Sequence, residues 1–274
     1  MRIPPRTSFL VATALVLAAA GWAWFEAGRI RVNSVIVHVD SLPAGLESLR
    51  IAQITDLHVG SARSRTWLNR TVELLGQLQP DLVVSTGDMI DGKLDWIDPL
   101  AREFLQIQPP LGKYAVLGNH DFYSGVKGSL RFHEAGGFIM LRQEVATPIK
   151  ELRLVGVDGP ADGRRGWRER TDEMPLLSEE SREDLVILLK HYPKVEPEAL
   201  GLFDLQLSGH THGGQVFPFG LLQAGYRPGL HELEGGSWLF LSPGTGTWGA
   251  PLRLACPPEI TLIEFRPRRG SQQA

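Results

Sequence analysis

The sequence predicts an α/β domain in which two facing mixed β-sheets form a sandwich flanked by helices, preceded by one N-terminal apolar helix. Three observations predict this fold class. Short apolar runs recur along the chain and end in polar residues, a stretch with helical spacing falls between two of them, and further β-rich segments follow. Alternating strands and helices are typical of layered α/β domains, and the additional strands indicate a second sheet.

The apolar helix is predicted from residues 8–25, an uncharged run that follows Arg2 and Arg6. Eighteen helical residues rise about 27 Å, just enough to cross the hydrocarbon core of a bilayer. Trp22 and Trp24 stand at one end, where aromatic belts lie in membrane proteins. An uncleaved anchor, a cleaved signal peptide and a buried helix all fit this pattern. We therefore expect an anchor or signal segment over residues 1–30 and a separate domain over residues 31–274.

Five of the predicted strands are followed by polar side chains that can bind metals. The strands span residues 51–54, 82–85, 114–117, 186–189 and 205–207, and a helix is expected over residues 65–79. Further strands are expected at residues 152–157, 237–242 and 259–265. The polar residues after the five strands are, in chain order, Asp56 and His58, Asp88 and Asp91, Asn119, His120 and Asp121, His191, and His210 and His212.

These side chains predict a metal centre with two ions. Ligands of open α/β sheets bind beyond the carboxyl ends of the strands, where the five strand ends would meet. Turn preference explains a single Asp or Asn at a strand end, but it does not explain five coincidences that bring five histidines together, four of them as possible ligands. Carboxylate, amide and imidazole donors without thiolate suit Mn²⁺, Fe or Zn²⁺. Seven such donors exceed one tetrahedral ion and suit a carboxylate-bridged pair of ions about 3.5–4 Å apart.

Composition excludes several other classes of protein and site. The formal net charge of -3 gives no basic footprint, so we expect no nucleic-acid partner. Cys256 is the single cysteine, which excludes an internal disulfide and a cysteine-rich zinc site. His38, His133 and His231 lie outside the motifs, and we interpret them as structural residues.

The order of the motifs resembles that of the calcineurin-like metallophosphoesterase family. D-x-H at residues 56–58, G-D-x-x-D at 87–91, G-N-H-D at 118–121, a lone histidine at 191 and G-H-x-H at 209–212 occur in the family's order, and the resemblance covers about residues 45–265. Within that family, "GHTHGGQVFPFG" and "GTGTWGAPLRLACPPEI" look most like the membrane-associated bacterial branch described as phosphodiesterase- or phosphohydrolase-like.

The resemblance implies a role for each candidate residue. Asp56, His58 and His212 would bind the first of two divalent ions, with manganese favoured over iron or zinc, and Asp88 would bridge the two. Asn119, His191 and His210 would complete the second site. His120 would be the general acid and Asp91 would orient it, although Asp91 also fits a plain capping or turn residue. A hydroxide between the metals would be the nucleophile, and the glycines would allow the tight approach.

Departures from the family pattern bear on the substrate. Protein phosphatases of the family carry arginines where this chain has Gly92 and Leu117, which argues against a protein phosphatase. The apolar segment 216–222 predicts either an exposed apolar rim beside the metals or a loop packed in the core. Together with the anchor, the rim suggests a lipid-linked phosphodiester or pyrophosphate such as that of UDP-2,3-diacylglucosamine. A phosphatase or nucleotidase for small soluble esters and a catalytically silent membrane scaffold are the alternatives.

The resemblance and the apolar run together predict a location. We expect a single span in the bacterial inner membrane, with the periplasmic face slightly favoured for the domain. Arg2, Arg6 and the amino terminus on one side nearly balance Arg29 and Arg31 on the other, so the positive-inside rule discriminates little.

Overall fold

The chain folds into two six-stranded mixed sheets, seen in a computed structural model that describes residues 4–60, 64–92, 97–159, 172–177 and 183–268. Arg2, which flanks the apolar run, lies outside these residues. The first sheet has the order β1-β12-β2-β3-β4-β5 and the second β10-β11-β9-β8-β7-β6. The strands of the first sheet are β1 (Arg31–Val39), β12 (Glu259–Pro267), β2 (Leu49–Ile54), β3 (Leu82–Ser85), β4 (Lys113–Ala115) and β5 (Ile139–Met140). Those of the second are β10 (Gly229–Glu232), β11 (Trp238–Leu241), β9 (Leu205–Ser208), β8 (Leu185–Lys190), β7 (Leu152–Val157) and β6 (Glu144–Ala146).

The predicted fold class is confirmed, including the second sheet. The strands predicted by sequence pattern form with ends that shift by one or two residues; β4, for example, ends at Ala115 rather than at residue 117. The sequence pattern missed β1, which pairs in parallel with β12 at the edge of the first sheet. Residues 31–36 of β1 are exposed or half-buried and mix polar with apolar side chains, so the strand lacks the continuous apolar run of the central strands.

Alternating side chains of the central strands fill two layers of core. Leu185, Ile187 and Leu189 of β8 point into the layer between the two sheets, where they meet Ile51 and Val84 of the first sheet. Val186 and Leu188 point to the outer face of the second sheet. Period-2 alternation thus lets one strand serve two apolar layers, which explains why every residue of β8 is buried.

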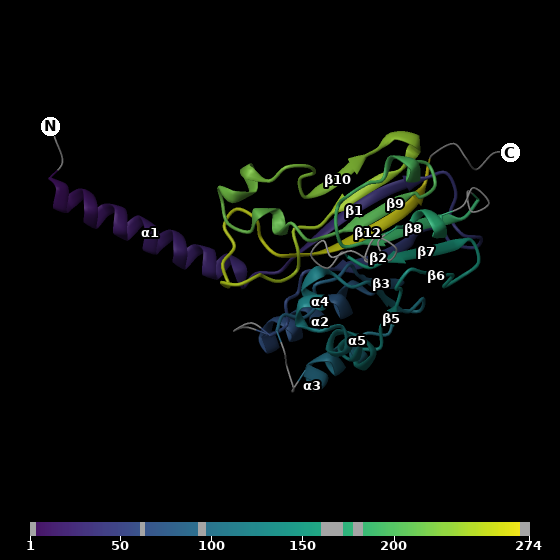
Figure 1. Cartoon of the computed structure of the whole chain (residues 1–274), viewed down its shortest axis with the longest axis horizontal. Coiled ribbons are helices and arrows are strands. Elements are labelled where there is room, and N and C mark those ends of the chain that lie inside the picture. The colour runs from purple at the N-terminus through teal and green to yellow at the C-terminus, as the bar shows by residue number, and fades with distance from the viewer. Residues whose placement is uncertain (1–3, 61–63, 93–96, 160–171, 178–182, 269–274) are drawn as a thin grey trace.

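Helices cover the outer face of the first sheet (Figure 1). They are α2 (Ser64–Leu78), α3 (Ile97–Ala101), α4 (Asn119–Ser124) and α5 (Val126–Ala135), with a short 3₁₀ helix at Arg102–Gln106. In α2, Leu68, Val72 and Leu75 form the buried stripe that the helical spacing predicts. These helices pack against Ala52 and Ile54 of β2, the residues that point away from the second sheet.

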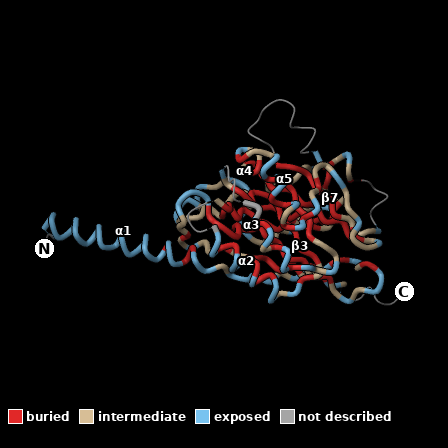
Figure 2. Tube along the Cα trace, turned by 90° about the horizontal axis from the view of Figure 1, so that it is seen from below, coloured by how far each residue is buried: buried red, intermediate tan, exposed pale blue. Residues whose placement is uncertain are grey.

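The N-terminal helix α1 (Pro5–Ala27) projects from the domain and is exposed along most of its length (Figure 2). Its last turn is different, because Ala23, Glu26 and Ala27 are buried against the domain. The main-chain N–H of Arg253 donates to the carbonyl of Ala23 at 2.9 Å, and the N–H of Ala255 donates to Oε2 of Glu26 at 2.9 Å. The helix therefore leaves the domain from a fixed contact with the segment that precedes β12.

Candidate metal centre

The carboxyl ends of β2, β3, β4, β8 and β9 bring the predicted residues to one edge of the sandwich. Asp56 and His58 follow β2, Asp88 and Asp91 follow β3, and Asn119 opens α4 just after β4. The second sheet supplies His191 after β8 and the pair His210 and His212 after β9. Parallel neighbours within each sheet end at the same edge, and the sandwich places the two edges together.

Asp56, His58 and His212 form the first cluster of possible ligands. One donor atom of each lies within 4.8 Å of the others. The Nε2 atoms of His58 and His212 are 3.1 Å apart, and Oδ1 of Asp56 lies 3.4 Å from Nε2 of His212. Two imidazole nitrogens that face each other beside a carboxylate can direct their lone pairs at one shared cation.

Asp88, His191 and His210 form a second cluster with the same 4.8 Å limit. Oδ2 of Asp88 lies 3.1 Å from Nε2 of His191, while Oδ1 of Asp88 accepts the main-chain N–H of His120 at 2.7 Å. The main-chain N–H of His210 in turn donates to the Asp56 carboxylate at 3.0 Å, which ties the second cluster to the first.

Asp91 and His120 lie beside the first cluster. Nδ1 of His120 is 3.3 Å from Oδ1 of Asp91, and Nδ1 of His58 is 3.7 Å from Oδ2 of the same carboxylate. Asp91 and His120, with 34% and 18% of their side chains accessible, are more exposed than the residues of the two clusters other than His210. This pair therefore stands at the mouth of the site.

The backbone of the site is strained at the residues that carry donors. Asp56, His58, Asp88, His210 and His212 all adopt positive φ, between 49° and 76°. Residues other than glycine avoid positive φ, and holding one in such a sparsely populated conformation costs about 1–3 kcal/mol. Such strain gathers at functional sites, where the surrounding fold holds a conformation that aims a side chain.

Two glycines make the close approach of the loops possible. A Cβ at residue 118 would collide with the carboxylate of Asp88, and a Cβ at residue 209 would collide with that of Asp56. The glycines of the G-N-H-D and G-H-x-H motifs are therefore required by the packing of the site itself.

Two buried donor atoms without a hydrogen-bond partner among the described residues suit a divalent cation. Oδ1 of Asn119 and Nε2 of His191 form no hydrogen bond with any residue that the structure describes. Buried polar atoms normally have partners, and a metal ligand is one of the accepted exceptions. Carboxylate, amide and imidazole atoms together are the donor set of a divalent transition metal, so the site fits such ions.

The protonation of two of the histidines also favours metal binding. Burial lowers the pKa of His58 and of His210 to about 4, which keeps both imidazoles neutral at neutral pH. Burial lowers the pKa of His191 as well, but the facing Asp88 carboxylate reverses this and raises it to about 9. That pair holds a proton that a bound cation would displace, because metal ligands must be deprotonated.

Sequence reasoning missed Arg253, a fully buried arginine behind the first cluster. Its guanidinium donates to the carbonyls of His212 at 2.9 Å, Pro243 at 2.8 Å and Gly246 at 2.6 Å, and Nη2 lies 3.2 Å from Nδ1 of His212. An isolated arginine within the apolar stretch "APLRLACPP" was the available clue. Its contact with His212, 41 positions earlier in the chain, depends on the fold.

Asp121 was noted in the sequence without a role, and two aromatic residues were missed. Asp121 is buried and accepts the main-chain N–H groups of Asp88 at 2.8 Å and Gly118 at 2.9 Å, which joins two loops of the site. Tyr192 packs on His210 with ring centroids 3.9 Å apart, and Trp248 packs on the edge of His120 at 5.8 Å. Asp121 belongs to the G-N-H-D motif, so the sequence could have suggested it.

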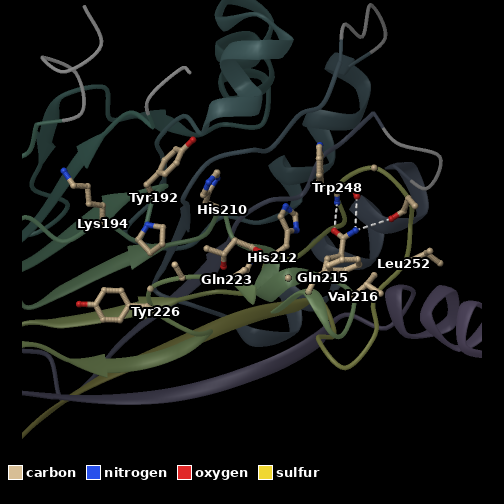
Figure 3. Close-up of a pocket in the computed structure, with 18 of the residues that line it drawn as sticks. Tyr192, Lys194, His210, His212, Gln215, Val216, Gln223, Tyr226, Trp248 and Leu252 are labelled. Atoms are coloured by element: carbon tan, nitrogen blue, oxygen red, sulfur yellow. Dashed lines mark hydrogen bonds between the residues drawn. The ribbon is translucent and has the colours of Figure 1, made fainter. Parts of the chain in front are cut away.

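A cavity of about 1220 Å³ opens beside His210 and His212. Figure 3 shows the two histidines between Tyr192 on one side and Trp248 on the other. Most of the lining is apolar or aromatic, and it includes Val216, Phe219, Tyr226 and Leu252. The cavity is larger than the roughly 300–1000 Å³ typical of small-molecule sites.

The chain belongs to the calcineurin-like phosphoesterases, whose family model matches residues 49–214. A metallophosphoesterase of Aquifex aeolicus is 36% identical over 92% of this chain and 98% of its own length. A Danio rerio protein named transmembrane protein with metallophosphoesterase domain is 33% identical over 86% of this chain, which spans 57% of that relative. The predicted family and class of activity are therefore confirmed, and the chain is a metal-dependent phosphoester hydrolase.

Solved structures of low sequence identity also match. A dimetal phosphatase of Danio rerio is 15% identical with a TM-score of 0.47, over 72% of this chain and 87% of that one. The family assignment depends on the closer sequence relatives.

Proposed function

We propose that the chain hydrolyses a phosphodiester or pyrophosphate bond of a lipid-linked substrate at a centre of two divalent ions, while α1 holds it to a membrane. The observation that carries the proposal is the large apolar cavity that opens directly beside the donor atoms of His210 and His212. A soluble nucleotide or phosphosugar gains little from such a lining, whereas an amphiphile gains from burying its apolar part.

Two clusters support a centre with two ions. Asp56, His58 and His212 would hold the first ion, and Asn119, His191 and His210 the second, with Asp88 between them. When bound, such ions lower the pKa of water and stabilise charge on the phosphoryl oxygens. Manganese suits this mixture of carboxylate, amide and imidazole donors, as do iron and zinc. The chain's part is to fix the donor atoms through strained strand-end turns before any substrate arrives.

His120 is proposed to donate the proton to the leaving oxygen. Its Nδ1 faces Asp91 at 3.3 Å, an arrangement that fixes the ring and leaves Nε2 for the substrate. The rings of Tyr123 and Trp248 pack against the His120 ring, with centroid distances of 5.3 Å and 5.8 Å, and this packing limits the rotation of His120. Asp91 also faces His58, so we assign it as a positioning residue for both imidazoles.

The surroundings of the site support a diester over a phosphoprotein. Gly92 and Leu117 occupy the places where a protein phosphatase would carry phosphate-binding arginines, and the side chain of Leu117 is fully buried. The main-chain N–H of Gly92 instead donates to Oγ of Ser124 at 2.8 Å. These two positions therefore supply no bidentate grip for a phosphate monoester dianion.

Membrane attachment is supported by the length and composition of α1. Its 23 residues would span roughly 34 Å as a helix, which exceeds the hydrocarbon core of a bilayer. Such a helix near the N-terminus also fits a signal segment. We propose that it is retained, because its last turn is buried against the domain. The bacterial inner membrane with a periplasmic domain stays our prediction for the location.

Paired hydrolysis assays test the proposal. Full-length protein in detergent and Mn²⁺ is given bis-p-nitrophenyl phosphate, p-nitrophenyl phosphate, and a screen of nucleotide-linked and extracted lipids. We expect the diester to be cleaved faster than the monoester and at least one lipid-linked diester or pyrophosphate to be cleaved faster still. Asp88→Ala protein is the control for contaminating activity. Preference for the monoester, with every lipid left intact, would instead establish a phosphatase for small soluble esters.

A further inference from the structure

The loop after the second pair of histidines exposes an apolar surface. Phe217, Phe219, Leu221 and Leu222 are all exposed, Leu222 to 79%, and so is Trp248. Gln215 joins this loop to the segment that carries Trp248, because its side chain donates to the carbonyl of Trp248 at 2.9 Å and accepts the N–H of Trp248 at 2.8 Å. We call these five exposed residues the apolar rim. Soluble proteins rarely leave such a patch bare, so the rim calls for an occupant.

Hydrogen bonds fix the apolar rim to the end of α1. The N–H of Phe217 donates to the carbonyl of Leu254 at 3.0 Å, and the residues on either side of Leu254 are bonded to Ala23 and Glu26 of the helix. Figure 1 shows these loops beside the point where α1 leaves the domain. The rim and the last turn of α1 are therefore parts of one connected unit.

The same end of α1 carries the residues that mark a membrane–water interface. Trp22, Trp24 and Phe25 are exposed there, and the guanidinium of Arg29 lies 5.5 Å from the centre of the Phe25 ring. Aromatic rings and snorkelling arginines concentrate at the level of the lipid headgroups. A bilayer crossed by α1 would therefore have its headgroup region at the level of the apolar rim.

We propose that the apolar rim is a membrane-docking surface, which enters the headgroup region beside α1 and holds the mouth of the cavity at the bilayer. Segment 216–222 carries no charge, and Arg227 donates to the carbonyls of Gly220 and Leu221. These bonds satisfy backbone groups that would otherwise lose their water in lipid. Phe219 belongs both to the rim and to the lining of the cavity, so the docked rim would open the cavity toward the membrane surface.

The inference rests on α1 as an anchor, so the experiment reports on anchor and rim separately. Labelling sites are introduced one at a time, in addition to the native Cys256, as Leu222→Cys in the rim, Leu15→Cys in α1, and Ile139→Cys as the matched exposed apolar control. Ile139 lies in β5, at the edge of the first sheet opposite β1. Each full-length protein is labelled with an environment-sensitive fluorophore and inserted in phosphatidylcholine–phosphatidylglycerol vesicles. The unmodified chain, with Cys256 alone, gives the labelling background.

Two quenchers then distinguish lipid from water. A nitroxide on the lipid acyl chain should quench the labels at residues 222 and 15 several-fold more than the label at 139, and aqueous iodide should show the reverse order. A label at 222 that behaves like the one at 139, while that at 15 is quenched by lipid, overturns the rim and leaves the anchor intact. Shielding of residue 222 from both quenchers indicates a protein partner and equally overturns the proposal. Failure at residue 15 refutes the anchor, and the docking of the rim beside α1 fails with it.

Discussion

Replacement of Arg253 by methionine should destabilise the domain and weaken the first metal cluster. Arg253 is fully buried, and it binds the carbonyls of His212, Pro243 and Gly246 at 2.9, 2.8 and 2.6 Å. Methionine fills much of the same volume but donates nothing, so three buried carbonyls lose a charged donor. At about 1.5 kcal/mol for each, the lower end for bonds to charged groups, the loss is about 4.5 kcal/mol.

Two further effects act on this value in opposite directions. The guanidinium no longer has to be desolvated, which favours the variant, and the packing of methionine is imperfect, which disfavours it. We therefore expect the free energy of unfolding to fall by about 3–5 kcal/mol, a large share of the roughly 5–15 kcal/mol that stabilises a typical domain. Bound metal should fall as well, because His212 loses the contacts that hold both its carbonyl and its ring.

The assay is urea unfolding of the full chain in detergent, followed by tryptophan fluorescence and paired with metal analysis. Arg70→Met is the matched control, since Arg70 is exposed and pairs only with Glu73 of its own helix among the described interactions, a contact worth less than about 1 kcal/mol. Arg253→Lys keeps the charge and part of the donor set. If Arg253→Met does not fold, Arg253→Lys takes its place, and its free energy of unfolding should lie below that of Arg70→Met. The reasoning is refuted if Arg253→Met matches Arg70→Met in both stability and metal content.

Four further predictions address the chemistry, the pH dependence and the anchor. His120→Asn should keep its metals and lose about 10²–10⁴-fold in rate on an alkyl diester, but much less on a p-nitrophenyl ester, whose leaving group departs without a proton; loss of metal would make His120 a ligand. Asp88→Ala should lose activity and much of both ions in metal analysis, whereas wild-type metal content would show that Asp88 does not bridge. Burial lowers the pKa of His133 to about 4, so unfolding takes up a proton below pH 6.5 and stability falls by about 3 kcal/mol between pH 6.5 and 4. His133→Phe should remove that part of the pH dependence in urea titrations, and an unchanged slope would contradict it. Deletion of residues 1–21 should leave a folded enzyme that is active on chromogenic esters. Deletion of residues 1–29 also removes the buried Glu26 and should lower the melting temperature. Equal melting temperatures of the two variants would show that the last turn of α1 adds nothing to stability.

The sequence by itself determined the class of fold and indicated the candidate donors. Strand-end residues can be read locally, because a short apolar run followed by Asp, Asn or His needs no knowledge of distant contacts. The order of five such motifs was specific enough to indicate the family, and the uncharged run at residues 8–25 predicted α1. The edge strand β1 escaped this reasoning, because a half-exposed strand leaves a weak apolar pattern.

Only the tertiary structure decided how these residues meet. His58 and His212 are 154 positions apart, and their 3.1 Å contact exists because strands of two different sheets end at one edge of the sandwich. Loop packing between distant segments likewise produces the positive φ of the five candidate donor residues and the contact of the Arg253 guanidinium with His212. It also produces the hydrogen bond that the N–H of Ala255 donates to Glu26. A local pattern specifies what a residue can do, whereas its partner depends on the sheet order and on loops that no periodicity encodes.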